Sequence, residues 1–212
     1  MRARFNPKAI EELNAFDRFI KQKEEIQKII TDNKDKKVFL EIGMGKGDFI
    51  TQMATLDRDN IYIGVEVSPP ILALAVKKLK RYEEENGRID NIYFMSFDAI
   101  TIAEVFEENQ IEKIYLNFSD PWPKKKHAKR RLTNEKFLKE YEKVLKKNGQ
   151  IEFKTDNRGL FEYSLVSLQN YGLKFNEVYL DLHKTDIFNV ETEYEKKFSP
   201  YGPIYKIVVE YK

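Results

Sequence analysis

The residues with the clearest capacity for chemistry follow a predicted buried strand, Ile114–Phe118. Asp120 and Trp122 come next, each followed by a proline that restricts the backbone of this turn. Six Lys or Arg residues then stand among the eight from Lys124 to Arg131. A carboxylate and an indole beside phosphate-attracting cations predict a site that holds one base of a nucleic acid. The alternative is a proline-rich turn with a solvated charge run, but the net charge of only +2 means that positive charge is concentrated here.

A glycine turn near the start of the chain predicts a second binding site. Gly43–Gly47 has the pattern Gly-x-Gly-x-Gly between a predicted strand, Val38–Ile42, and a predicted helix, Asp48–Leu56. Glycines let the backbone approach a ligand closely, and the helix start offers free N–H groups. Glu41 and Asp48 flank the turn with negative charge, which disfavours a pyrophosphate and suits a ligand with a cationic end, such as S-adenosylmethionine.

Acidic residues end the next two predicted strands. Glu66 follows Ile61–Val65, about 20 residues after the glycines, where a carboxylate can accept both ribose hydroxyls. The alternative for Glu66 is a chance surface acid. Asp98 follows Ile92–Phe97, where it can accept a hydrogen bond from an adenine amino group, cap a helix over Ile100–Glu108, or do both.

Composition excludes several classes of protein. The 212 residues, 42% of them hydrophobic, suit one domain, residues 1–212, with a full core. No run approaches the roughly 18 apolar residues of a membrane span, and no apolar signal segment opens the chain, so we expect a cytoplasmic protein without membrane contact. Cysteine is absent, which excludes disulfides, thiolate metal sites and cysteine nucleophiles. His127 and His183 have no partner pattern, so we expect no metal.

Strands and helices alternate, which predicts an α/β fold with a doubly wound, mostly parallel sheet and helices on both faces. Residues 1–37 predict an N-terminal arm, with Arg2 and Arg4, and covering helices, the first capped by Asn6. The later predicted elements are a helix over Asn134–Lys147 capped by Thr133 and closed by Asn148-Gly149, a strand over Gln150–Lys154, a helix over Arg158–Asn170, a strand over Leu173–Leu180 and a last strand over Ile204–Tyr211.

A long irregular segment, residues 181–203, contains Thr192-Glu193-Tyr194-Glu195. A long loop with two acids around a tyrosine is more often functional than not. The alternative is a capped turn that packs onto the last strand. Asp156 follows the strand Gln150–Lys154 and is expected at the same edge of the sheet as the other polar strand ends.

Five segments together resemble the bacterial tRNA (guanine-N7-)-methyltransferase family: Glu-Ile-Gly-Met-Gly-Lys-Gly at 41–47, Gly-Val-Glu at 64–66, Phe-Asp-Ala at 97–99, Asn-Phe-Ser-Asp-Pro-Trp-Pro-Lys at 117–124 and Thr-Glu-Tyr-Glu at 192–195. The resemblance extends from Phe5 onward, and 117–124 is its specific part. It implies a class I, Rossmann-like methyltransferase that uses S-adenosylmethionine, releases S-adenosylhomocysteine, and methylates N7 of the variable-loop guanine, position 46, of a tRNA partner.

The resemblance also implies roles for individual residues. Cofactor contacts are implied for Glu41, Gly43, Gly45, Gly47, Glu66, Asp98, Ala99, Asn117 and Asp120, and Asp120 is expected to lie closest to the chemistry. Substrate contacts are implied for Lys124, Asp156, Thr192, Glu193, Tyr194 and Glu195. RNA contacts are implied for Lys126, His127, Ala128, Lys129, Arg130 and Arg131, with one polar contact fewer at Ala128.

The implied chemistry suits the residues present. Guanine N7 has a lone pair and no proton, so its methylation needs no metal, thiolate or strong base, and a carboxylate such as Asp120 can stabilise charge that spreads onto the purine. One alternative is an exocyclic amino methyltransferase, because Asp120-Pro121-Trp122 partly matches the acid-Pro-Pro-aromatic turn of those enzymes, although the second proline is missing. The other is a non-catalytic RNA-binding protein with a Rossmann-like sheet. A monomer and a homodimer both fit the sequence.

Overall fold

The computed structural model describes residues 7–211, so the predictions for Arg2, Arg4 and Asn6 lie outside the described residues. The chain divides into two compact units, Met1–Asp98 and Ala99–Lys212. The single domain over residues 1–212 stays a prediction.

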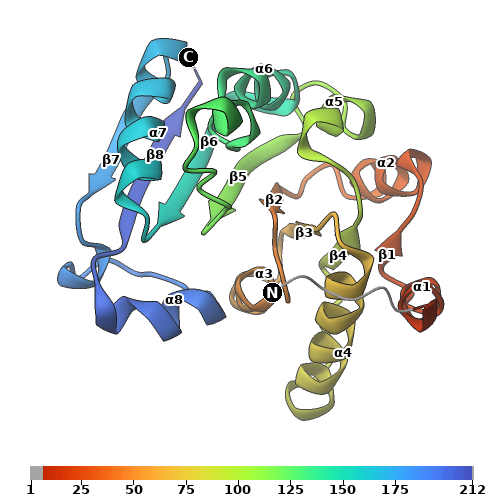
Figure 1. Ribbon diagram of the computed structural model, residues 1–212. Helices are drawn as coiled ribbons and strands as arrows, with labels where there is room; N and C mark the ends of the chain where they lie inside the picture. Colours follow the sequence, from red (N-terminus) through yellow and green to blue (C-terminus); the bar gives the residue numbers. More distant parts are fainter. Residues whose placement is uncertain (1–6, 212) are drawn as a thin grey trace. The chain divides into compact units, whose positions relative to one another are not determined.

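The first unit has, among its described residues, four parallel strands in the order β1-β4-β3-β2 (Figure 1). Phe19 and Ile20 lie within residues 1–37, where covering helices were predicted, but they form a strand because they pair with Phe94 and Met95 of β4. The bounds are β1 Phe19–Ile20, β2 Val38–Ile42, β3 Ile61–Val65 and β4 Ile92–Met95, with helices α1 Pro7–Asn14, α2 Lys23–Asp32, α3 Asp48–Leu56 and α4 Pro69–Asn86.

The core of the first unit includes the apolar face of α4, which packs against α1. Leu13, Leu72 and Val76 are all buried, and so is every residue of β3. Strands that are covered on both sides consist of nearly continuous apolar runs, and β2, which only Glu41 interrupts, and β3 both have the predicted bounds.

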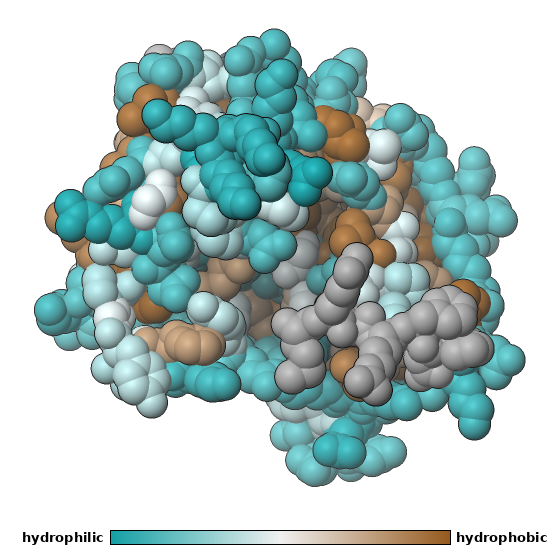
Figure 2. All heavy atoms as spheres, viewed as in Figure 1, coloured by the Kyte–Doolittle hydropathy of each residue, from teal (hydrophilic) through white to brown (hydrophobic). Residues whose placement is uncertain are grey.

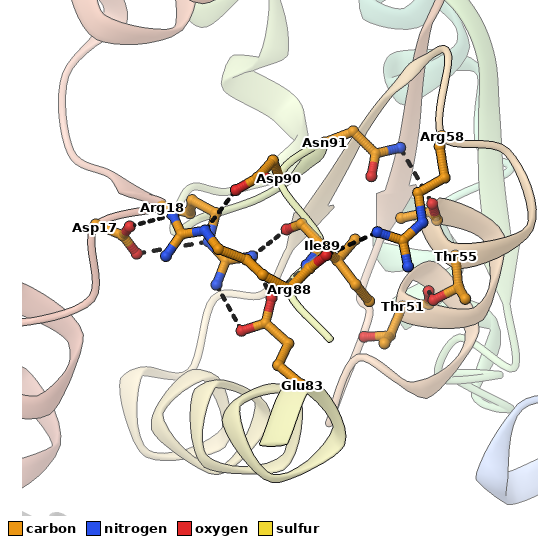
Figure 3. Close-up of polar contacts among 11 residues, drawn as sticks. Asp17, Arg18, Thr51, Thr55, Arg58, Glu83, Arg88, Ile89, Asp90 and Asn91 are labelled. Atoms are coloured by element: carbon orange, nitrogen blue, oxygen red, sulfur yellow. Dashed lines mark hydrogen bonds and ion pairs between the residues drawn. The ribbon is translucent and has the colours of Figure 1, made fainter. Parts of the chain in front are cut away.

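A polar network ties the start of β4 to its neighbours (Figure 3). Arg18 donates to both carboxyl oxygens of Glu83 at 2.7 Å and to the carbonyl oxygen of Ile89. Arg88 bridges Asp17 and Asp90. The network lies at the amino-terminal end of β4, whereas ligands of open α/β sheets bind at the carboxyl ends of the strands, so we assign it a structural role.

The second unit combines parallel and antiparallel pairs, in the order β5-β6-β8-β7. Strand β6 is parallel to β5, and β8 runs antiparallel to both β6 and β7 (Figure 1). The strands are β5 Ile111–Asn117, β6 Leu145–Thr155, β7 Lys174–Tyr179 and β8 Tyr205–Glu210; the α-helices are α5 Ile102–Val105, α6 Glu135–Val144, α7 Arg158–Tyr171 and α8 Glu193–Phe198; and 3-10 helices cover Ala99–Thr101, Lys125–Arg130, Leu182–Lys184 and Ser199–Tyr201.

Both predicted ends of α6 are wrong. Asn134, not Thr133, caps α6 by accepting a hydrogen bond from the Lys136 N–H, and buried Thr133 instead bonds Ser164 at 2.8 Å. The helix was predicted to run to Lys147 and to close at Asn148-Gly149, but the chain becomes extended at Leu145 because Leu145 pairs with Ile111 of β5. Tertiary pairing therefore overrides the local stop signal.

The predicted α/β class with mostly parallel strands is confirmed. Figure 2 shows that hydrophilic residues cover most of the visible face and that hydrophobic residues occur there in small patches. Within residues 7–211, none of the helices combines the length and the apolar character that crossing a membrane requires.

Candidate functional site

The glycine turn after β2 leaves space beside its backbone. Gly43, Gly45 and Gly47 have φ values of 77°, 57° and 77°, a conformation that glycine adopts without steric cost. A Cβ added at Gly43 or Gly45 would meet no atom within 4 Å. The turn therefore presents bare backbone to its surroundings directly before α3 begins, as predicted.

Met44 anchors this turn to β3. Its N–H donates to the Val65 carbonyl oxygen at 3.0 Å, and its side chain is buried. A Cβ added at Gly64 would approach the Met44 sulfur to 2.2 Å. Gly64 is thus required for the space it leaves, a function that its sequence position alone does not reveal.

Two acidic residues lie near the turn. The Glu66 carboxylate accepts hydrogen bonds from the Gly45 N–H at 3.3 Å and from the Ser68 N–H at 3.0 Å, which fixes its orientation. Glu41, in β2, is only 2% exposed. A carboxylate has about four lone-pair sites, so Glu66 can still accept ligand hydroxyls. The first unit therefore fits a ligand with neighbouring hydroxyls and a cationic end, and Asp98 is exposed where this unit ends.

In the second unit, Asp120 lies on a turn of unusual backbone conformation. Phe118 and Trp122 have φ values of 50° and 42°, which bulky residues rarely adopt. The Phe118 N–H donates to the Lys154 carbonyl oxygen at 2.9 Å, so the turn starts from a fixed point on β6. Asp120 itself is exposed, and Asn117 is buried at the end of β5. Backbone strain of this kind is concentrated at functional sites.

The basic run forms the 3-10 helix Lys125–Arg130. Lys124, Lys126 and Lys129 are exposed, as phosphate contacts require. His127 meets the Trp122 ring edge-on at 5.7 Å, and the Arg130 guanidinium lies 4.8 Å from the centre of the same ring. Two members of the predicted RNA-binding run therefore also hold the indole, and Ala128 is half-buried.

Phe118, Asp156 and Tyr194 lie together where β5 and β6 end and α8 begins. The Tyr194 hydroxyl donates to Asp156 at 3.1 Å, and its ring lies 5.1 Å from that of Phe118. Burial and the Asp156 carboxylate raise the pKa of Tyr194, which keeps its hydroxyl protonated. The side chain of Thr192 caps α8 by accepting from the Glu195 N–H at 2.9 Å, so a capped turn exists here beside the exposed Glu193 and Tyr194.

Glu195 is fully buried in an ion pair with Lys154. The Lys154 ammonium donates to Glu195 at 2.7 Å, to the Val190 carbonyl oxygen at 2.9 Å and to Asn189 at 3.1 Å, and both charged side chains are 0% exposed. Asn189 and His183 approach the other Glu195 oxygen at 2.7 and 3.0 Å. Burial favours an indirect role for Glu195, namely the placement of Tyr194, and its direct contact with substrate stays a prediction.

The charge state of this pair follows from its surroundings. Burial raises the pKa of Glu195, but the Lys154 ammonium and the hydrogen bonds from Asn189 and His183 outweigh burial and hold the pKa below its ordinary value. Glu195 is therefore ionised at neutral pH, and its ion pair with Lys154 fastens α8 to β6.

Comparison with known proteins decides the family. The chain matches a family model described as "Putative methyltransferase" over residues 35–206. The tRNA (guanine-N(7)-)-methyltransferase of Pediococcus pentosaceus is 51% identical over 177 residues, which are 82% of this chain and 81% of that protein. The tRNA (guanine-N(7)-)-methyltransferase of Bacillus subtilis is 51% identical over 180 residues, 84% of this chain and 82% of that protein. This chain belongs to the tRNA (guanine-N7-)-methyltransferase family.

Solved structures of distant methyltransferases share the fold of this family member. An antibiotic-related methyltransferase has a TM-score of 0.65 at 21% identity and covers 90% of this chain and 94% of its own. A SAM-dependent methyltransferase from Aquifex aeolicus has a TM-score of 0.55 at 15% identity and covers 97% of this chain and 93% of its own. The predicted class I, Rossmann-like methyltransferase fold is confirmed.

Sequence reasoning missed two features of this tRNA (guanine-N7-)-methyltransferase family member. Lys154 was treated as the end of a strand, and its partner Glu195 lies 41 positions away, too far for a local pattern to connect them. The hydrogen bonds that Arg131 donates to the Pro121 and Trp122 carbonyl oxygens were also missed, because Arg131 stands in a run of cations and looks like its neighbours there.

Proposed function

We propose that this chain transfers the methyl group of S-adenosylmethionine to N7 of the guanine at position 46 in the variable loop of tRNA, in the cytoplasm. The observation that carries the proposal is 51% identity, over more than four fifths of each chain, to two tRNA (guanine-N(7)-)-methyltransferases. The exposed lysines beside Asp120 support it, because RNA binding requires clustered positive charge.

The first unit contains residues that suit this cofactor. When bound, S-adenosylmethionine supplies a methyl group on a positively charged sulfur. Glu66, held by backbone N–H groups, would accept the ribose hydroxyls, and the buried carboxylate of Glu41 would favour the cationic end. We assign the remaining contacts to the glycine turn, Asp98, Ala99, Asn117 and Asp120.

The chain has to supply position and charge more than proton transfer. Guanine N7 has no proton, so no residue must remove one before the N7–methyl bond forms. Positive charge then develops on the purine, and a fixed carboxylate at Asp120 stabilises it more in the transition state than in the ground state. Lys124, Asp156 and Tyr194 would hold the guanine, and the exposed lysines would hold the tRNA backbone.

Mass analysis of nucleosides from tRNA incubated with the protein and labelled cofactor tests the proposal. We expect 7-methylguanosine, and no product when the position 46 guanine is replaced by adenine. A base methylated on an exocyclic amino group would favour the alternative enzyme class. Bound tRNA without any methylation would favour a non-catalytic RNA-binding protein.

Asp120→Asn tests the chemical role of the carboxylate, because it keeps the shape and removes the charge. We expect single-turnover methyl transfer at saturating tRNA and cofactor to fall by about 10²–10³-fold. A wild-type rate at saturation would reduce Asp120 to a binding or structural residue.

A further inference from the structure

Arg131 differs from the lysines of the basic run in what its side chain contacts. Its Nε donates to the Pro121 carbonyl oxygen and its Nη2 to the Trp122 carbonyl oxygen, each at 3.0 Å. The guanidinium carbon also lies 4.2 Å from the centre of the Tyr163 ring on α7. Arg131 is half-buried, whereas Lys129 is exposed. Three groups therefore hold this one side chain against the turn that carries Asp120.

The turn has a physical need for such support. Trp122 has a φ of 42°, and a bulky residue keeps a positive φ only when its surroundings enforce it. Pro121 has no N–H, so its carbonyl oxygen is the only backbone group through which it can form a hydrogen bond. A guanidinium is a planar fork that can donate to two carbonyl oxygens and stack on a ring at once, and an ammonium cannot reproduce that geometry.

We propose that Arg131 is a positioning residue: its guanidinium fixes the Asp120–Trp122 turn against α7, and it does not serve as a tRNA phosphate contact. Arg130 and His127 complete the arrangement by holding the Trp122 ring. The effect on methyl transfer rests on the proposed function. The effect on the turn does not, because it involves neither tRNA nor cofactor.

The structural arm of the test uses fluorescence of the protein alone. Trp122 is the single tryptophan of the sequence, so intrinsic emission reports directly on the turn. We expect Arg131→Lys and Arg131→Gln to shift the emission to longer wavelength and to increase quenching by acrylamide. Tyr163→Leu, which removes the ring under the guanidinium, should do the same, whereas Tyr163→Phe keeps the ring and should retain wild-type emission.

The functional arm separates positioning from phosphate binding. Arg131→Lys keeps the positive charge, yet we expect its single-turnover rate at saturating tRNA and cofactor to fall by about 10- to 100-fold, because two charge-assisted hydrogen bonds lose their geometry. Arg131→Gln should leave the salt dependence of tRNA binding unchanged. Lys129→Gln, in the same run, should flatten the log–log salt slope by about 0.7–0.9.

Two results would overturn the proposal. One is a wild-type rate and wild-type Trp122 emission in Arg131→Lys. The other is a salt slope that flattens in Arg131→Gln as much as in Lys129→Gln, with unchanged emission. If circular dichroism shows that the Arg131 variants do not fold, the test uses Tyr163→Leu instead. Trp122 emission in Tyr163→Leu equal to that in Tyr163→Phe would then count against the proposal. A wild-type protein without methylation activity would refute the proposed function and leave the fluorescence test intact.

Discussion

Replacing Lys154 with methionine should destabilise the second unit strongly. Methionine keeps most of the apolar stem but removes the ammonium that donates to Glu195, Asn189 and Val190. The Glu195 carboxylate then stays buried at 0% exposure without its counter-charge. Breaking a buried pair from one side costs about 3–5 kcal/mol, so we expect the free energy of unfolding to fall by about that amount.

The assay is urea unfolding followed by Trp122 fluorescence, which reports on the unit that contains the pair. Lys174→Met is the matched control, because Lys174 also pairs with a glutamate at 2.7 Å but is 58% exposed. The control should cost at most about 1 kcal/mol. Adding Glu195→Gln to Lys154→Met should recover part of the loss, with a coupling of about 1–3 kcal/mol. If Lys154→Met lowers the free energy of unfolding no more than Lys174→Met does, the buried pair does not fasten α8 to β6.

The pH dependence of the same pair has a definite sign. The pKa of Glu195 lies below its ordinary value of 4.5 in the folded protein, so its ionic stabilisation is present above about pH 4.5 and is lost as pH falls through the folded pKa. In Lys154→Met the ammonium is gone, so burial raises the pKa of Glu195. Protonation of Glu195 at acid pH then removes the buried charge and recovers part of the variant's lost stability. The stability gap between wild type and Lys154→Met should therefore shrink as pH falls from 7 towards 4, and a gap that widens would contradict the argument.

Three further predictions concern other parts of the chain. Gly64→Ala should lower the free energy of unfolding by about 1–3 kcal/mol, because the new Cβ meets the buried Met44 sulfur; unchanged denaturation would mean that Met44 moves at no cost. Glu66→Ala should weaken S-adenosylmethionine binding by about 10-fold or more in calorimetric titration, and equal affinity in the folded variant would remove the ribose assignment. Replacing Lys126 and Lys129 by glutamine should flatten the log–log salt dependence of tRNA binding by about 1.4–1.8, and an unchanged slope would make the run a solvated face.

Elements bounded by local signals were predictable from the sequence. The helix Asp48–Leu56 follows a glycine turn and has the predicted bounds. Boundaries that depend on pairing with a strand distant in sequence could not be predicted. Phe19–Ile20 and the start of β6 at Leu145 are extended because a neighbouring strand offers hydrogen bonds, and no local propensity records this.

The same distinction holds for the candidate site. The closeness of Glu66 to the glycine turn was predictable, because the spacing between a glycine turn and the next strand end is short and regular. The burial of Glu195 was not, because it depends on Lys154 far away in sequence. Arg131 shows a third case: its residue type was correctly placed in a basic run, but only the fold decides which cation faces solvent and which one contacts carbonyl oxygens.

The position of β8 has a consequence for how the protein is made. β8 pairs with both β6 and β7, yet the ribosome synthesises it after both. Until β8 emerges, β6 and β7 each present an unpaired edge, the kind of surface that templates aggregation. The strands of the first unit are all synthesised before Asp98 and so can pair earlier. The interval between the synthesis of β7 and that of β8 is therefore when we expect a nascent chain of this protein to depend most on chaperones.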